Sequence, residues 1–363
     1  QGPLVSGIQV DHGTDTASLR MPADSITRKR IISLPANIVK KKGTSVHDTR
    51  GKVIGAARQK EWQEAIEHEN DPDAAWAVVS GVAKAKKPKA SQLTNDTAWN
   101  QGQVLRVVCV ADTMGFAKRM GCLPRGDILI HTGSMTKHGE LADFESFVHW
   151  LDKQDFEHKV VVPGPRDIPL DPGEGKDMWV RQFGTGKVFP DPDVIRGNIR
   201  GVAHLLEGDE IVCNGVRIWG GPWKPGGKKT EAFSIPRGPG SRETWSFVPK
   251  DADVLVTAGA PLGHLDMDPQ GCRTGCLGLL EEVEDIRPRL HVFGGEPDNE
   301  GASTNGSTMF INARCTNVKN TVRYEAVTVD IDPASTPNPE YEVAQPTEDE
   351  GTMSVSEESS ESE

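Results

Sequence analysis

The clearest pattern of hydrophobic and polar positions lies between residues 104 and 167, where short apolar runs alternate with polar loops. The runs read VLRVVCVA, DILIHT and KVVV, and an amphipathic stretch separates the second from the third. Each run is too short for a buried helix, is rich in β-branched residues and is followed by Gly or Pro, which predicts three buried strands. Such strands deliver their C-terminal loops to one edge of an α/β sheet, where functional residues collect.

The amphipathic stretch predicts a helix over residues 140–151. Its apolar side chains recur at three- and four-residue spacing, which suits packing against a sheet; they are Leu141, Phe144, Phe147, Val148 and Leu151. The Gly- and Pro-rich segment 171–193 that follows predicts a long surface loop with room for one helical turn.

The pattern continues to residue 332. Asn214-Gly215 lies between two short strand-like runs and predicts a type I′ hairpin. Further elements are expected as strands over 253–257, 290–293 and 308–313 and as a helix over 276–286. The run VRYEAVTVDID alternates as a half-buried strand does and predicts the last strand.

The two ends of the chain differ from this centre in charge. Residues 1–90 hold 15 Lys and Arg against 10 Asp and Glu, whereas residues 330–363 hold 11 acidic residues and no Lys or Arg. Helix formers dominate 56–69 and 73–86, and Pro, Glu and Ser dominate the end. We therefore predict a basic, partly helical extension (1–99), a central domain (100–332) and an acidic disordered tail (333–363).

Cysteine spacing, hydropathy and basic clusters indicate the expected cellular location and partners of the protein. Six cysteines are scattered along the chain without a second pair at zinc-binding spacing, which favours a reduced, cytoplasmic location. No apolar run reaches the length of a membrane span, so no membrane partner is expected. The basic clusters Arg28-Lys29-Arg30 and Lys40-Lys41-Lys42 suit an acidic surface or nucleic acid, although aromatic residues for base stacking are absent. A solvated leader is an equally open interpretation.

The loops after the predicted strands carry a series of short motifs. They read Asp112-Thr113-Met114, Gly133-Ser134, Gly164-Pro165-Arg166-Asp167, Ala258-Gly259 and Gly294-Gly295-Glu296-Pro297. In order and spacing they resemble the calcineurin-like metallophosphoesterase superfamily, and most of all its small eukaryotic metallophosphodiesterase branch. That family has Asp-x-His, Gly-Asp, Gly-Asn-His-Asp/Glu, His-Gly and Gly-His-x-His at these places. The resemblance extends over about residues 103–332 and implies an α/β fold, a four-layer α/β/β/α sandwich of two mixed sheets.

The resemblance also implies where two metal ions would bind. A dinuclear phosphoesterase needs carboxylate, imidazole and amide ligands around both ions, and of the family's ligands only Asp112 is present. The other positions now carry Met114, Ser134, Pro165, Arg166, Ala258, Gly295 and Pro297. One carboxylate cannot hold two cations, so we predict a remnant pocket, formed by these residues with Asp112 and Asp167, that has no metal, no cofactor and no catalytic residue.

Asp112 then needs another partner. A carboxylate at the end of a buried strand is costly unless it is paired or protonated. One hypothesis is that Arg166 forms a salt bridge with Asp112; equally open is that Arg166 points into solvent and Asp112 caps a backbone turn. We expect His131, His264 and His291 to be hydrogen-bonded structural histidines, because none stands at a metal position of the family.

The predicted function is therefore that of a pseudoenzyme. The domain would serve as a structural or protein-interaction module, with protein partners reached through the extension and the tail. An alternative is a weak metal-dependent phosphodiesterase. Another is a nucleotide- or phosphate-binding regulator, with Arg166, Lys118, Arg119 and His264 as candidate phosphate-binding residues. Nucleic-acid binding through the basic arm is a further class and would show steep salt dependence.

Overall fold

The computed structural model describes residues 56–89, 93–227 and 230–334. The predicted basic arm up to residue 55 and the acidic tail from residue 335 lie outside these residues and stay predictions. In the described part of the chain, no helix combines the length and the apolar character needed to cross a membrane.

The first sheet is built from the strands that the opening pattern predicted. Its order is β13 (Val327–Ile331), β1 (Leu105–Ala111), β2 (Ile128–Thr132), β3 (His158–Val162) and β4 (His204–Leu205). Strands β1 to β4 are parallel, and β13 runs antiparallel to β1. The C-terminal ends of β1, β2 and β3 therefore lie side by side, which confirms the predicted sheet edge.

The second sheet is also mixed. Its order is β11 (Gly301–Thr304), β12 (Met309–Asn312), β10 (Leu290–Phe293), β9 (Val254–Thr257), β6 (Val216–Gly221) and β5 (Asp209–Cys213). The inner strands β12, β10, β9 and β6 are parallel, and β11 and β5 pair antiparallel at the two edges. Between β5 and β6, Asn214 and Gly215 have φ angles of 50° and 82°, which confirms the predicted type I′ hairpin.

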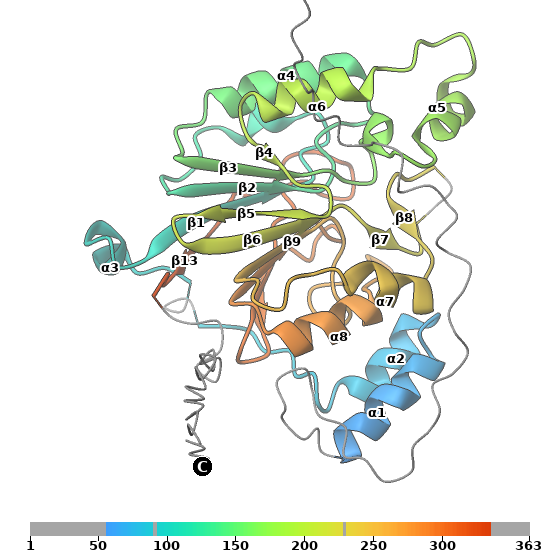
Figure 1. Ribbon diagram of the computed structural model, residues 1–363, viewed down its shortest axis with the longest axis vertical. Coiled ribbons are helices and arrows are strands. Elements are labelled where there is room, and N and C mark those ends of the chain that lie inside the picture. The colour runs from blue at the N-terminus through green and yellow to red at the C-terminus, as the bar shows by residue number, and fades with distance from the viewer. Residues whose placement is uncertain (1–55, 90–92, 228–229, 335–363) are drawn as a thin grey trace, which may run out of the picture. The chain divides into compact units, whose positions relative to one another are not determined.

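The two sheets pack face to face and helices cover their outer faces (Figure 1). Side chains that alternate along the strands fill the space between the sheets, because successive side chains of a strand point to opposite faces. This inner core includes Val107, Cys109, Ile130, Val160, Val254, Val256, Val292 and Ile311. The predicted four-layer α/β/β/α sandwich is thereby confirmed.

Helices α4 (Leu141–Asp152), α5 (Gly175–Phe183) and α6 (Pro192–Arg200) belong to the layer outside the first sheet. Phe144 and Phe147 of α4 pack in one cluster with Val108 and Leu129. The prediction that residues 171–193 form a long loop was wrong. Both α5 and the start of α6 lie in this segment, because buried Met178 and Trp179 supply the apolar face that the Gly and Pro content obscured.

Helices α7 (Pro239–Trp245) and α8 (Leu277–Ile286) cover the second sheet. Leu279 and Val283 of α8 pack with Leu255 and Phe310 of the sheet. Helix α8 begins where the sequence predicted, after Cys276, whose thiol accepts a hydrogen bond from the backbone N–H of Leu279. Cys276 is therefore a buried helix cap.

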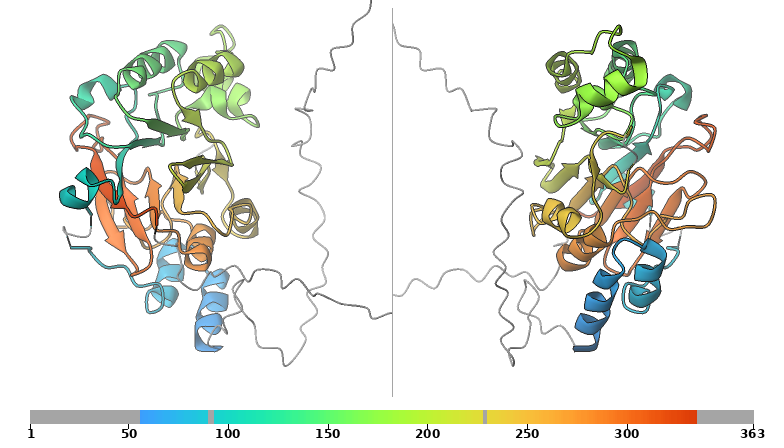
Figure 2. Two further views of the ribbon diagram at one scale, coloured as in Figure 1. Left: turned by 60° about the vertical axis from the view of Figure 1, so that its left-hand side comes forward. Right: turned by 90° about the vertical axis from the view of Figure 1, so that its right-hand side faces the viewer.

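Helices α1 (Ala56–Glu67) and α2 (Pro72–Val79) precede the sandwich in sequence and pack on α8 (Figure 2). Ala65 of α1 and Ala75 of α2 share a buried cluster with Leu277 and Leu280 of α8. Asp71 caps α2 by accepting a hydrogen bond from Ala74 N. Both helices, which lie within the predicted extension 1–99, therefore pack against the domain.

The remaining elements are short and connect the larger ones. They are α3 (Asp96–Asn100), the 3-10 turns η3 (Ala117–Met120) and η4 (Ile168–Leu170), and the parallel pair β7 (Lys224–Pro225) and β8 (Ser234–Ile235). Two described residues between α2 and β1 pair with the outer edges of the sheets. Lys86 pairs with Thr304 of β11, and Leu93 O accepts a hydrogen bond from Asp330 N of β13.

Candidate functional site

The loops that follow the parallel strands of both sheets surround a cavity of about 180 Å³. Eight of the nine predicted pocket residues line it: Asp112, Met114, Ser134, Pro165, Arg166, Ala258, Gly295 and Pro297. They meet because each follows the C-terminal end of a parallel strand in one sheet or the other. Polar side chains that the prediction did not include also line the cavity, among them Lys224, Glu231, Glu296, Arg314 and Asn320.

Asp112 is the central carboxylate of the site. It follows β1 directly, is 5% exposed, and has a left-handed backbone with φ of 52°. Its Oδ1 accepts a hydrogen bond from Ser134 N at 2.8 Å, and its backbone oxygen accepts one from Thr316 Oγ1 at 3.0 Å. The carboxylate is therefore held in place by the loop after β2, and the main chain by the loop after β12.

Glycines leave the space in which this carboxylate lies. A Cβ at Gly133, where φ is +75°, would lie 2.5 Å from Asp112 Oδ1, and a Cβ at Gly294 would lie 2.7 Å from Oδ2. A Cβ at Gly164 would meet the backbone carbon of Gly133 at 2.3 Å. The Gly residues of the three motifs are thus required for close approach of the loops around Asp112.

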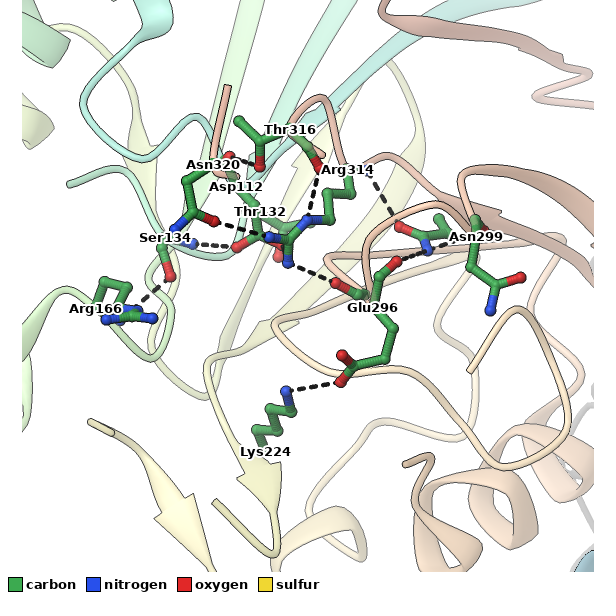
Figure 3. A network of polar contacts seen from close by, with 12 residues as sticks. Asp112, Thr132, Ser134, Arg166, Lys224, Glu296, Asn299, Arg314, Thr316 and Asn320 are labelled. Carbon is green, nitrogen blue, oxygen red and sulfur yellow. Dashed lines mark hydrogen bonds and ion pairs between the residues drawn. The ribbon is translucent and has the colours of Figure 1, made fainter. Parts of the chain in front are cut away.

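Arg314 supplies the counter-charge for Asp112. Its Nη1 lies 3.6 Å from Asp112 Oδ2, and the two side chains are 11% and 6% exposed (Figure 3). The hypothesis that Arg166 pairs with Asp112 was wrong. Arg314 enters from the loop after β12, and among the described residues no carboxylate is within ion-pair distance of Arg166. Burial raises the pKa of Asp112, whereas Arg314 and the Ser134 N–H favour the ionised form and oppose this rise.

Arg166 contacts the site through its backbone. Its N–H donates to Ser134 Oγ at 3.2 Å, so the hydroxyl at the position of the Asp in the family's Gly-Asp motif joins the loops after β2 and β3. The side chain of Arg166 lines the cavity. Burial lowers the pKa of His138, and the positive charges of Arg166 and Lys137 lower it further.

A second ion pair lines the cavity. Lys224 Nζ lies 3.2 Å from Glu296 Oε1, and the two side chains are 28% and 18% exposed (Figure 3). Asn312 holds the Glu296 loop by donating from Nδ2 to Glu296 O and to Asn299 O, at 3.3 and 3.0 Å. The prediction missed both charged residues of this pair, although Glu296 stands inside a quoted motif.

Asp167 was predicted to belong to the pocket, but it lies behind it. Its carboxylate is fully buried and accepts hydrogen bonds from Gly164 N, Met135 N, Thr136 N and Thr136 Oγ1 at 2.8–3.1 Å. Burial raises the pKa of Asp167 to about 7, against the effect of these donors. Asp167 therefore connects the loops after β2 and β3 and does not line the cavity.

The candidate phosphate-binding residues are not brought together. Lys118 and Arg119 lie exposed on η3, where the Arg119 guanidinium stacks at 4.7 Å from the ring centre of Phe116. His264 is fully buried and stacks on Phe310 at 3.6 Å. Of this predicted set only Arg166 lines the cavity.

The histidines that were expected to be structural are hydrogen-bonded side chains of the core. His131 Nε2 pairs with Thr113 Oγ1 at 3.0 Å, and His291 Nε2 with Thr257 Oγ1 at 2.8 Å. His264 Nδ1 pairs with Ser303 Oγ at 3.0 Å. Burial is the main cause that lowers the pKa of each of these three residues to about 3, so they are neutral at physiological pH.

The donor set does not fit a pair of divalent metal ions. Met114, Pro165, Ala258, Gly295 and Pro297 offer no charged or imidazole ligand. Asp112 faces the Arg314 guanidinium and Glu296 faces the Lys224 ammonium, so a positive charge already accompanies both carboxylates. Across residues 56–89, 93–227 and 230–334, no three His, Cys, Asp or Glu side chains are grouped as a metal site requires.

Comparisons with known proteins found relatives that are about one-third identical to this chain over the matched residues. No protein-family model matches it. Metallophosphoesterase domain-containing protein 1 of Homo sapiens is 34% identical over 231 residues, which cover 61% of this chain and 68% of the relative. UPF0046 protein T07D4.2 of Caenorhabditis elegans is 32% identical over 280 residues, which cover 73% of this chain and 69% of the relative.

Among solved structures, TT1561 of Thermus thermophilus is 15% identical, with a TM-score of 0.36, and the match covers 57% of this chain and 88% of that one.

Proposed function

Because the chain belongs to the metallophosphoesterase family that includes metallophosphoesterase domain-containing protein 1, we propose that it retains the fold without metal-dependent hydrolysis. The domain would serve as a structural or protein-interaction module. Its positions at the strand ends still converge on one cavity, but they carry side chains that cannot replace the carboxylate and imidazole ligands of a dinuclear centre.

The observation that carries this proposal is the contrast between the site and its scaffold. The glycines at 133, 164 and 294 still allow the loops to close around Asp112. The sheets and their covering helices keep complete apolar cores. The residues that the fold needs are thus retained, whereas the ligands that two metal ions need are not.

Metal content tests the loss of hydrolysis. The full chain would be loaded with Mn²⁺ or Zn²⁺, desalted and measured by mass spectrometry, and assayed in parallel on bis(p-nitrophenyl) phosphate with Mn²⁺. The expected results are far less than one ion per chain and no release of nitrophenol above the buffer rate. One or two retained ions together with turnover that EDTA abolishes would contradict the proposal.

The interaction role rests on the charged ends of the chain. Residues 1–90 carry a net charge of +5, from 15 basic and 10 acidic residues, and residues 330–363 carry 11 acidic residues without a base. Quantitative affinity purification would compare the full chain with variants that lack residues 1–55 or 335–363. Loss of the same reproducible partners from either truncated variant is expected, and an unchanged partner set in both would argue against the role assigned to the ends.

A second candidate function is metal-independent binding of a phosphate or nucleotide. It is favoured by one observation: Arg166, Lys224 and Arg314 all line the same cavity. Guanidinium groups bind phosphate oxygens well without a metal. Calorimetric titration with AMP and with inorganic phosphate would test this function, with Arg166→Ala as the variant expected to weaken binding and Arg119→Ala as the control outside the cavity. Equal, non-saturable heats for all three proteins would exclude it.

A further inference from the structure

We propose that Arg314 is the resident cation of this site: its guanidinium provides Asp112 with the positive charge that metal ions would otherwise provide, and so makes the folded pocket independent of divalent metal. This inference rests on the proposed function, since it explains how the family's fold can persist around a strand-end carboxylate that has lost its ions. It assigns to Arg314 a role that the sequence motifs did not indicate.

The first argument is that the main chain places Arg314 beside Asp112. Ala111, the residue before Asp112, forms a bridge with Arg314 in which Ala111 N donates to Ala313 O at 2.7 Å and Cys315 N donates to Ala111 O at 3.0 Å. The end of β1 and the chain after β12 are thus bonded together. The backbone pairing therefore brings the side chains of Asp112 and Arg314 close together, and their proximity does not depend on the conformation of one flexible side chain.

The second argument is that the guanidinium is fixed on several sides (Figure 3). Its Nε donates to Thr316 O at 2.9 Å, and its Nη1 donates to Gly295 O at 2.8 Å. Its Nη2 donates to Asn320 Oδ1 at 3.3 Å. A guanidinium whose Nε, Nη1 and Nη2 each donate a hydrogen bond loses little further freedom on facing a carboxylate, so it can act as a permanent counter-ion.

The third argument is that these contacts join the elements that the family's metal ions would join. Asp112 follows β1, Gly295 follows β10, and Thr316 and Asn320 follow β12. Arg314 therefore connects loops of both sheets. Gly295 stands where the resemblance places a histidine ligand, and its backbone oxygen now accepts a hydrogen bond from Arg314.

The other cations of the cavity do not meet these conditions. Lys224 pairs with Glu296 at 3.2 Å. Arg166 contacts Ser134 through its backbone N–H, and within the described residues its side chain forms no ion pair. Arg166 is therefore a matched control: an arginine of the same cavity without the proposed role.

The test is a double-mutant cycle on the full chain, measured by thermal unfolding. We expect Arg314→Ala to lower the Tm by roughly 5–10 °C, because it leaves Asp112 buried without its counter-charge. Adding Asp112→Asn should recover at least half of this loss, because the amide needs no counter-charge and keeps an oxygen for Ser134 N. Arg166→Ala should shift the Tm by less than about 2 °C and be additive with Asp112→Asn. If Arg314→Ala yields no soluble protein, Arg314→Gln, which is neutral and closer in size, takes its place in the cycle.

A metal arm separates this inference from the proposed function. The wild-type Tm should change by less than about 1 °C between 1 mM EDTA and 1 mM Mn²⁺, because a ligand stabilises a protein only if it binds the folded state. Additive effects of the substitutions at 112 and 314 would overturn the role of Arg314, even if the wild type binds no metal and hydrolyses nothing. A wild-type Tm that rises in Mn²⁺, with retained ions, would overturn both.

Discussion

The indole ring of Trp76 lies directly against Gly263: a Cβ built on Gly263 would be 1.9 Å from Trp76 Cζ3. Trp76 belongs to α2, and Gly263 to the loop between β9 and α8. On the same indole the Arg273 guanidinium lies 4.7 Å from the ring centroid, and the Arg273 N–H faces the Asp73 carboxylate at 3.3 Å. Helix α2 therefore packs against the sandwich through a contact between Trp76 and Gly263 that is too close for any residue with a side chain.

Gly263→Ala should displace Trp76 and loosen α1 and α2. We expect a loss of about 1–3 kcal/mol in unfolding free energy from overpacking, in addition to the strain at φ of +85°. Urea denaturation would measure the loss, and limited proteolysis would report earlier cleavage between residues 56 and 89.

Gly271→Ala is the matched control for this substitution. Gly271 has the same φ of +85°, but a Cβ there meets no atom within 4 Å. The difference between the two variants therefore isolates the contact with Trp76. Equal losses would mean that backbone strain, and not the indole, explains the effect.

Acid should unfold the protein partly through its buried histidines. Burial, with a smaller contribution from His264, lowers the pKa of His291 to about 3, whereas an unfolded histidine titrates near 6.5. The native state therefore excludes a proton that the unfolded chain binds. The stability that His291 contributes is fully present above pH 6.5 and is lost as the pH falls toward 3. At pH 5 the loss from this residue is about 2 kcal/mol.

His291→Gln should reduce this pH dependence. Glutamine can keep the bond from the Nε2 position to Thr257 Oγ1 but does not titrate. Between pH 7 and pH 5 the variant should lose about 2 kcal/mol less than the wild type in urea unfolding. Substitution of the exposed His204 by Gln should leave the wild-type dependence unchanged. A slope in His291→Gln identical to the wild type would disprove the assignment.

Two arginines on α6 should differ in their effect on stability, although both face Glu207. Arg196 is 17% exposed and donates to Glu207 from Nε and Nη2, with its closest contact at 2.8 Å. Arg200 is 54% exposed and reaches the same carboxylate at 3.5 Å. We expect Arg196→Ala to cost about 2–4 kcal/mol and Arg200→Ala less than about 0.5 kcal/mol in chemical denaturation. The reverse order would contradict the burial argument.

Asn312→Asp should destabilise the loop that carries Glu296. Nδ2 of the fully buried Asn312 donates to two backbone oxygens, and an Asp oxygen there would face both as an acceptor. The expected cost is about 2–4 kcal/mol, measured by urea unfolding. Asn317→Asp serves as the control, because within the described residues the Asn317 side chain hydrogen-bonds only through its Oδ1, which accepts from Lys319 N and Thr321 N. A similar cost at both positions would show that added charge alone is responsible.

Much of the fold could be predicted because its signals are local. Strands of four to seven residues with β-branched side chains were visible between turn residues. The two residues Asn214 and Gly215 were enough to predict a hairpin. The segment 171–193 was predicted wrongly because its Gly and Pro content indicated a loop. Helix α5 forms there because Met178 and Trp179 pack in the same cluster as Phe144 and Phe147 of α4.

The candidate site was predictable only in part, because some of its residues carry a local signal and others are brought to the cavity only by packing. The strand-end rule indicated that the loops after parallel strands lie at one edge of a sheet. The family resemblance then implied that Asp112, Ser134, Pro165 and Gly295 share one pocket, and all four line the cavity. Applied to β12, the rule would also have pointed to Arg314, two residues after Asn312. No local pattern marks Lys224, which reaches the cavity from β7.

By itself, the sequence determined which strands exist and in what order their loops follow. Its resemblance to the family implied that the ligands expected of two metal ions are replaced at those loops. These properties depend on residue type and on spacing along the chain, which the printed residues contain. Only the tertiary structure decided which positive charge faces Asp112. The answer, Arg314, depends on the bridge that pairs Ala111 with the chain after β12. Asp112 and Arg314 are far apart in sequence, and they become neighbours only when the chain has folded.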